Sequence, residues 1–292
     1  MSYFELLQET YFGLFIFMMG LLYGAVMIII MFYARVQAYD HYLETPVDRP
    51  LPFREWALRY EVGADPQYLF IWSIASRAFS TIHAIVMVVT VSHLISDFGI
   101  AALWKYNFYL RHPDGMETIL NLNAFMMAYL ITDVSFLIAH RLQLPANVRT
   151  DDNFVFAVIH HLIGAISMLQ FIETGQVHFN SLYYSFTEIS TITLNVAWLA
   201  VKLGWDQHPE LRKIYEVAGF TTWLLFLFVR IIGSVALITH LYVNLNSILQ
   251  LSWANYFFAF GANSIVIGLN FYWFYKLTVK AFEPPVLRRK EE

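Results

Sequence analysis

Seven apolar segments, each long enough to cross a lipid bilayer, constrain the fold of this chain more than any other feature. Polar intervals separate them, and they run over Phe12–Tyr33, Tyr68–Ile95, Ile119–His140, Phe154–Phe171, Ser181–Lys202, Tyr215–Tyr242 and Trp253–Leu277. Only 14% of the 292 residues are charged, against about 25% in soluble domains. The sequence therefore predicts an all-α, polytopic membrane protein with seven transmembrane helices.

Basic residues are distributed unequally between the two sides that seven helices would define. Arg77 and Arg230 lie within predicted helices. Of the remaining lysines and arginines, fourteen lie on the side of the first, third and fifth loops and the C-terminal tail, and two lie on the other side. The positive-inside rule then predicts that the C-terminus faces the cytosol or a matrix, and that the N-terminus faces the lumen or the outside.

Three parts are expected along the chain. The first helix and a proline-containing polar connector occupy residues 1–67, a helical domain occupies 68–280, and a charged tail occupies 281–292. The chain has no cysteine, which excludes disulfides and thiolate chemistry. Its formal net charge of −4 argues against nucleic acid as a partner.

The fifth segment carries a stripe of polar residues at helical spacing. Its members are Ser181, Tyr184, Glu188, Thr191 and Asn195. Intervals of three and four residues place them on one face of a helix. In a bilayer such a face should point into the bundle, where it makes interhelical hydrogen bonds or lines a cavity. Interhelical bonding is the favoured interpretation for Ser181, Thr191 and Asn195, whereas both remain open for Glu188.

Other polar residues fall into two layers when depth is counted at roughly 1.5 Å per residue. The layer about 10 Å below the basic surface contains Asp133, His160, Asn195, Asn270 and, slightly deeper, Arg77. The second layer contains His83, Glu188 and Arg230. We expect Asp133 to pair with Arg77 or with a histidine, and Glu188 to pair with Arg230. The Glu188–Arg230 pair is expected to be structural, and a pairing of Asp133 with the histidines to be functional.

The adjacent residues His160 and His161 lie inside the fourth segment, where a polar side chain is costly unless it has a role. Neighbouring residues on a helix point about 100° apart, so the two rings face different directions. Small residues share the face of His161 and admit a close neighbour: Ala157, Gly164 and Ala165. An imidazole oriented by Asp133 is a ready base or nucleophile. A single histidine pair is too few ligands for a di-iron site, so no metal is expected.

Four blocks resemble the TLC superfamily, the membrane proteins related to TRAM, Lag and ceroid-lipofuscinosis proteins, which includes the ceramide synthases. The blocks lie in the family's order at 76–85, 129–133, 158–162 and 187–195, with Phe228-Val-Arg-Ile231 following the last. The resemblance covers about 71–277 and leaves out the first helix and its connector. It implies that the second to seventh helices form a six-helix, TLC-type barrel around a lipid cavity.

The chain is more similar to the TLC-domain-only proteins than to the ceramide synthases. The synthases carry a His-Asp and a further Asp after the histidine pair, and the three corresponding positions here hold Asn180, Ser181 and Tyr184, so the two acidic residues are missing. If the resemblance implies acyl transfer, His160, His161 and Asp133 are the candidate catalytic residues. If the chain binds a lipid instead, the candidate lipid-binding residues form a larger set: Arg77, His83, Asp133, His160, His161, Tyr184, Glu188, Asn195, Arg230 and Asn270.

Three functions remain open from the sequence. The first is a lipid-handling protein that binds a phospholipid or sphingolipid and needs no cofactor. The second is an acyltransferase that uses acyl-CoA, and the third is an accessory subunit of a larger membrane complex. The family is mostly found in the endoplasmic reticulum, although the inner mitochondrial membrane obeys the same charge rule. Receptor and retinal-protein signatures are missing, since the seventh segment has no Asn-Pro-x-x-Tyr and no lysine before Lys276.

Overall fold

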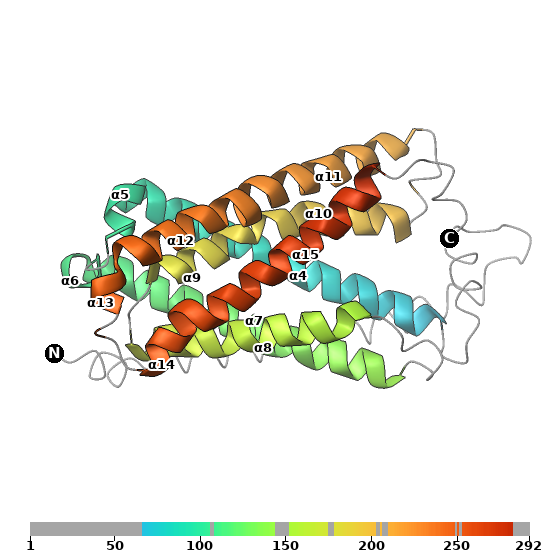
Figure 1. Ribbon diagram of the computed structural model, residues 1–292. Helices are drawn as coiled ribbons and strands as arrows, with labels where there is room; N and C mark the ends of the chain where they lie inside the picture. The colour runs from blue at the N-terminus through green and yellow to red at the C-terminus, as the bar shows by residue number, and fades with distance from the viewer. Residues whose placement is uncertain are drawn as a thin grey trace, which may run out of the picture.

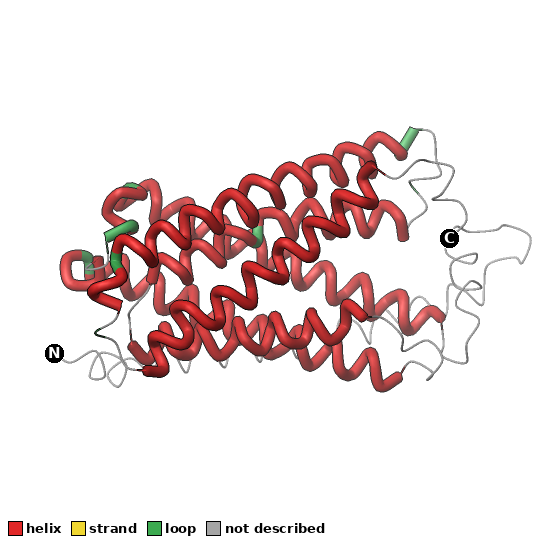
Figure 2. Tube along the Cα trace, in the orientation of Figure 1, coloured by secondary structure: helices red, strands yellow, loops and turns green. Residues whose placement is uncertain are grey.

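The described part of the chain forms a bundle of helices (Figure 1). The structure is a computed structural model that describes residues 66–105, 108–143, 152–174, 178–202, 205, 210–248, 250 and 253–282. Within these ranges no strand is present (Figure 2). The predicted first helix, its connector and the tail from residue 283 lie outside the described residues, so the count of seven helices stays a prediction.

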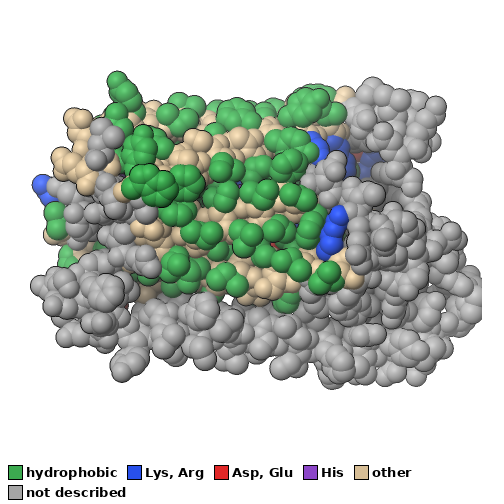
Figure 3. All heavy atoms as spheres, turned by 60° about the horizontal axis from the view of Figure 1, so that its bottom comes forward, with side chains coloured by type: hydrophobic (Ala, Val, Ile, Leu, Met, Phe, Trp, Pro, Cys, Tyr) green, Lys and Arg blue, Asp and Glu red, His purple; other side chains and the backbone are tan. Residues whose placement is uncertain are grey.

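Five helices are long and apolar enough to cross a membrane. They are Ser76–Phe98, Pro113–Ile138, Phe154–Ile172, Arg212–Val243 and Phe257–Phe282. These correspond to the predicted second, third, fourth, sixth and seventh segments. Figure 3 shows apolar side chains across the middle of one face, with lysine and arginine toward its two ends. This distribution matches a bilayer-embedded surface, and the chain is an integral membrane protein.

The helices keep the numbering of Figure 1. The longer elements are α4 (Pro66–Phe98), α7 (Pro113–Gln143), α8 (Asp152–Thr174), α9 (His178–Thr187), α10 (Ile189–Lys202), α11 (Arg212–Leu225), α12 (Gly233–Val243) and α15 (Asn263–Phe282). Two π-helical stretches, η2 (Phe226–Ile232) and η3 (Phe257–Ala262), interrupt the sixth and seventh segments. The short elements are α5 (Ile100–Leu103), α6 (Phe108–Arg111), α13 (Leu245–Ile248) and α14 (Trp253–Tyr256).

The fifth segment is two helices rather than the single one expected from its periodicity. α9 ends at Thr187, α10 begins at Ile189, and Glu188 forms the turn between them. Hydroxyl groups explain the break, because Thr187 donates to the carbonyl of Tyr184 at 2.7 Å and Ser190 donates to that of Thr187 at 2.9 Å. Such bonds compete with the backbone ladder of a helix. Figure 2 shows the break as a short loop in the middle of the bundle.

Helix neighbours follow a regular order around the bundle. α4 packs against α7 and α10, α7 runs along α8, and α8 contacts η3 and α15. α15 in turn contacts η2 and α11, and α11 packs against α10. α9 lies among these helices and contacts α4, α7, α8, η2 and α12. The fifth segment therefore reaches most of the other helices, which positions its polar side chains inside the bundle.

The connection between α4 and α7 is fixed by one glycine and two histidines. Gly99 has a φ of 75° and ends α4, a conformation that a residue with a Cβ adopts only with strain. The ring Nε2 atoms of His178 and His240 then lie 2.9 and 3.0 Å from the carbonyl oxygens of Leu103 and Trp104. As N–H donors the two rings hold the end of α5 against α9 and α12.

Candidate functional site

Asp133 on α7 and His161 on α8 meet at the interface of their helices. Nδ1 of His161 lies 3.0 Å from Oδ2 of Asp133, and the side chains are 16% and 10% exposed. This is an ion-pair distance, although the ring N–H is not aligned for a hydrogen bond. Close packing allows the contact, because a Cβ on Gly164 would lie 2.9 Å from the Leu130 side chain on α7. The expected partnership of Asp133 with a histidine is thus the one that the fold forms.

His160 faces a different helix from its neighbour. Its ring packs edge-on against Trp273 of α15 with centroids 5.2 Å apart, while the His160 and His161 rings are 5.4 Å apart. Nδ1 of His160 is buried and has no hydrogen-bond partner. The histidine pair therefore connects α7, α8 and α15, and it leaves one imidazole nitrogen without a protein partner.

The α4 side of this region is packed with aromatic rings. His83 is fully buried and stacks on Tyr129 with ring centroids 3.7 Å apart. Its Nε2 lies 3.1 Å from the sulfur of Met126. The Tyr129 hydroxyl donates to Ser80 at 3.1 Å. His83 is therefore held in an aromatic layer beside the Asp133–His161 pair, a position that favours a packing role.

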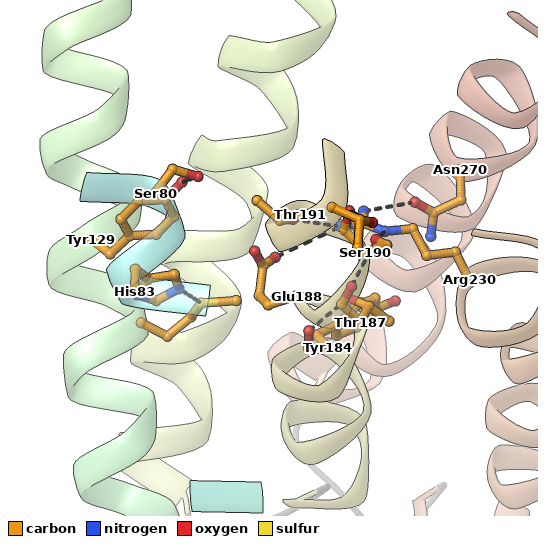
Figure 4. A network of polar contacts seen from close by, with 12 residues as sticks. Ser80, His83, Tyr129, Tyr184, Thr187, Glu188, Ser190, Thr191, Arg230 and Asn270 are labelled. Carbon is orange, nitrogen blue, oxygen red and sulfur yellow. Dashed lines mark hydrogen bonds and ion pairs between the residues drawn. The ribbon is translucent and has the colours of Figure 1, made fainter. Parts of the chain in front are cut away.

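A second polar cluster surrounds Arg230 on the π-helical stretch η2. Its Nε donates to the hydroxyl of Ser190 at 2.9 Å, and its terminal nitrogens donate to Asn270 and Thr191, both at 3.3 Å. A guanidinium nitrogen lies 3.8 Å from Oε1 of Glu188. In Figure 4, Glu188 lies between the His83–Tyr129 stack and Arg230. The expected Glu188–Arg230 pair is formed, and hydroxyl and amide groups hold the guanidinium.

The widened turn of η2 is supported by α9. The hydroxyl of Tyr183 donates to the carbonyl oxygens of Val229 and Arg230, each at 3.2 Å, and it lies 3.1 Å from the Ser234 hydroxyl. A Cβ on Gly233 would lie 2.9 Å from the Tyr183 ring, so glycine is needed there for the tyrosine to approach. π-helical turns are frequent at functional sites, and this one positions Arg230.

Members of the polar stripe on α9 and α10 bond to four different parts of the bundle. Ser181 donates to Asn123 of α7, and the Tyr184 hydroxyl donates to Asn263 of α15. Thr191 accepts from Arg230, and Asn195 donates to Thr81 of α4 at 3.0 Å. The stripe faces the bundle interior and makes interhelical hydrogen bonds, as expected for Ser181, Thr191 and Asn195.

Arg77, the alternative partner of Asp133, is excluded, and one expectation about depth is corrected. Arg77 donates to Asn195 of α10 at 3.2 Å, because it projects from α4 toward α10 while Ser76 faces Asp133. Asn270 binds Arg230 although counting residues had placed them in different layers. Counting from helix ends treats every helix as parallel and regular, and the π-helical turns change the rise along the sixth and seventh segments.

Several residues of the site escaped sequence reasoning. They are Ser190, Trp273, Asn123, Asn263 and Tyr183. Asn123, Ser190 and Asn263 are polar residues within apolar segments, and this position in the sequence could have indicated them. Nothing in the sequence distinguishes Trp273 and Tyr183 from the other aromatic residues, which make up 18% of the chain.

The chemistry available at the site follows from its side chains. It combines an imidazole beside a carboxylate, a second imidazole with a free ring nitrogen, and a guanidinium held by neutral groups. In the part of the chain that the structure describes, no three histidine or acidic side chains are grouped to hold a metal ion. The site can therefore donate and accept hydrogen bonds and carry charge in an otherwise apolar interior.

Comparison with known protein families places one domain on the chain. Residues 73–279 match the TLC domain, which covers every helix that contributes to the site. The comparisons with proteins of curated function and with solved structures gave no match.

Proposed function

Because this chain belongs to the TLC-domain family, we propose that it binds a membrane lipid inside its helical bundle. The polar end of the lipid lies against His160, His161 and Asp133, and the acyl chains run between the helices. The protein then acts in membrane lipid homeostasis by holding or transferring that lipid.

One observation carries this proposal. Asp133 and His161 lie 3.0 Å apart on facing helices within the span, and Nδ1 of the adjacent His160 is buried without a partner. A buried polar atom without a partner costs about 1–3 kcal/mol, and polar residues inside a bilayer mark binding or transport sites by default. A lipid headgroup with hydroxyl, amide or phosphate groups supplies the missing hydrogen bonds.

The order of the helices supports a cavity for acyl chains. The neighbours run from α4 to α7, α8, α15, α11, α10 and back to α4, which is the order that a closed six-helix barrel requires. We propose that these helices form the barrel that the family resemblance implies. The basic ends of the helices then face the cytosol or a matrix, following the positive-inside rule.

Acyl transfer is the second candidate, and the Asp133–His161 contact favours it. A carboxylate beside an imidazole can orient it as a nucleophile. The ring nitrogen would take the acyl group from an acyl-CoA thioester, releasing the thiol, and then pass it to an acceptor amine, which loses a proton. The residues at the positions that hold His-Asp and a further Asp in the synthases favour lipid binding instead, because none of them is acidic here. Ser181 and Tyr184 bond to α7 and α15, and Asn180 is fully buried.

The test is the lipid content of the purified full-length protein. We expect one lipid class to remain in stoichiometric amount after extensive washing in mild detergent, measured by lipid mass spectrometry. His160→Ala and His161→Ala should lose most of it, because each removes a polar partner of the headgroup. The matched control is His93→Ala, since His93 is a histidine of α4 with a 75% exposed side chain.

Equal lipid retention in the wild type and both histidine variants, with unchanged melting temperatures, would sink the proposal. Turnover of a sphingoid base with acyl-CoA separates the two candidates. Product formation that is lost in His161→Ala would favour acyl transfer, and its absence in the wild type would leave lipid binding.

A further inference from the structure

We propose that Arg77 and Trp198 form a separate site, at the seam between α4 and α10, for the phosphate of an anionic membrane lipid. This site faces away from the Asp133–His161 pair, because Ser76 and Arg77 point toward different helices. It therefore goes beyond the headgroup site proposed above.

The geometry begins at Asn195, which joins the two helices. Its amide nitrogen donates to the Thr81 hydroxyl at 3.0 Å and to the carbonyl of Arg77 at 3.3 Å. Toward the ends at Pro66 and Lys202 the helices diverge, as Figure 1 shows for α4 and α10. Arg77 and Trp198 both lie on that side of the joint. The seam is thus closed at Asn195 and separates toward the basic side of the membrane.

The guanidinium of Arg77 lies where α4 and α10 diverge, and among the described residues only its Nη1 donates a hydrogen bond. Nη1 donates to Oδ1 of Asn195 at 3.2 Å, and the group lies over the Trp198 ring, 5.4 Å from its centre. A guanidinium carries five N–H donors, and a cation–π contact leaves its edge open to a further partner. Arg77 as a whole is partly exposed.

The ion pairs of the other buried charged residues indicate that the missing partner of Arg77 is an anion. The other membrane-embedded arginine, Arg230, has Glu188 at 3.8 Å. Asp133 is engaged by His161. Among the described residues, no carboxylate comes within the 4.0 Å ion-pair distance of Arg77. An arginine within a membrane span is costly without a counter-ion, and a phosphate oxygen pair fits the planar guanidinium edge with two parallel hydrogen bonds.

A lipid is the source of phosphate that this position favours. Arg77 lies on the half of α4 that begins at Pro66, slightly deeper than the layer counted at roughly 10 Å below the basic surface, so its counter-ion has to come from a molecule of the bilayer rather than from solution. The exposed apolar side chains of Ile82, Ile85 and Val89 continue along the same helix into the bilayer. A phospholipid can place its phosphate at Arg77 and its acyl chains along this helix.

The experiment measures lipid selectivity of the full-length protein in mixed micelles of phosphatidylcholine and phosphatidylglycerol, read by native mass spectrometry. The wild type should retain phosphatidylglycerol preferentially. Arg77→Gln should retain about fivefold less of it, the loss that corresponds to about 1 kcal/mol of attraction between one basic side chain and an anionic lipid, while phosphatidylcholine binding stays unchanged. Arg77→Lys keeps the charge without the planar fork and should fall between the two.

The matched control is Arg212→Gln, which removes the same charge from an exposed arginine already paired with Glu216 at 2.7 Å. It should not change the selectivity. Equal retention of phosphatidylglycerol in Arg77→Gln and the wild type overturns the proposal, and so does its displacement by inorganic phosphate, which would indicate a small-anion site. Loss of total lipid in His161→Ala with an unchanged preference for phosphatidylglycerol separates this site from the histidine site.

Discussion

The ion pair between Glu188 and Arg230 offers the most direct energetic test of the buried polar network. The two groups are 8% and 7% exposed, and their closest atoms are 3.8 Å apart. At an effective dielectric constant of about 20, two unit charges at that distance attract by about 4 kcal/mol. Removing one partner leaves the other charge buried without compensation, which typically costs about 3–5 kcal/mol.

We therefore expect Glu188→Gln and Arg230→Met each to lower the free energy of unfolding by about 3 kcal/mol or more, and the double variant to cost less than either single one. Arg230 also binds Ser190 and Asn270, and those bonds are lost with or without Glu188, so the difference isolates the pair. The assay is equilibrium unfolding by sodium dodecyl sulfate in mixed micelles, followed by helical circular dichroism.

The exposed pair Arg212–Glu216 provides the control cycle. Its atoms are closer, at 2.7 Å, but its side chains are 62% and 54% exposed, and such surface pairs couple by about 0.5 kcal/mol or less within a helix. If the losses at Glu188 and Arg230 simply add in the double variant, the two charges do not interact and the pairing is refuted.

Two further substitutions test how glycines position the helices. Gly164→Leu should separate α8 from α7, because its Cβ would lie 2.9 Å from Leu130, and it should reduce both the melting temperature and lipid retention. The control is Gly219→Leu, where nothing lies within 4 Å of the new Cβ, and it should reduce neither. Equal effects of the two substitutions would contradict the close contact at Gly164. Gly99→Ala should cost about 1–3 kcal/mol by forcing a residue with a Cβ to a φ of 75°, which detergent unfolding measures; an unchanged stability would show that the turn relaxes freely.

Hydrophobic length located most of the helices from the sequence. The predicted segments Tyr68–Ile95, Ile119–His140 and Phe154–Phe171 lie within α4, α7 and α8. This worked because a bilayer demands about 20 apolar residues per span whatever the fold. The match to the TLC domain over residues 73–279 likewise agrees with the resemblance found in the four short blocks.

The interruptions of the helices were not predictable in the same way. A polar stripe at intervals of three and four residues continues through the break at Glu188, because both halves keep helical phase across a single turn residue. The π-helical stretch around Arg230 has no periodicity of its own in so short a run. Both features depend on hydroxyl groups, such as those of Ser190 and Tyr183, that bond to particular backbone or guanidinium atoms in the folded bundle.

Charge pairing could be predicted only as a short set of alternatives. Depth in the membrane and the sign of the charge limited the partners of Asp133 to Arg77 or a histidine, and the rotation of α4 about its own axis then decided between them. That rotation cannot be inferred from one sequence, since Ser76 and Arg77 are neighbours on α4 and still face α7 and α10 respectively.

The break between α9 and α10 has a consequence for how the protein enters its membrane. α9 has 10 residues and α10 has 14, so at roughly 1.5 Å per residue neither crosses a hydrocarbon core of about 30 Å alone. Ser181, Tyr184, Thr191 and Asn195 bond to α7, α15, η2 and α4 respectively, and an isolated fifth segment would carry Glu188 into lipid unpaired. We therefore expect the fifth segment to enter the bilayer stably only together with the sixth, which supplies Arg230 as the partner of Glu188.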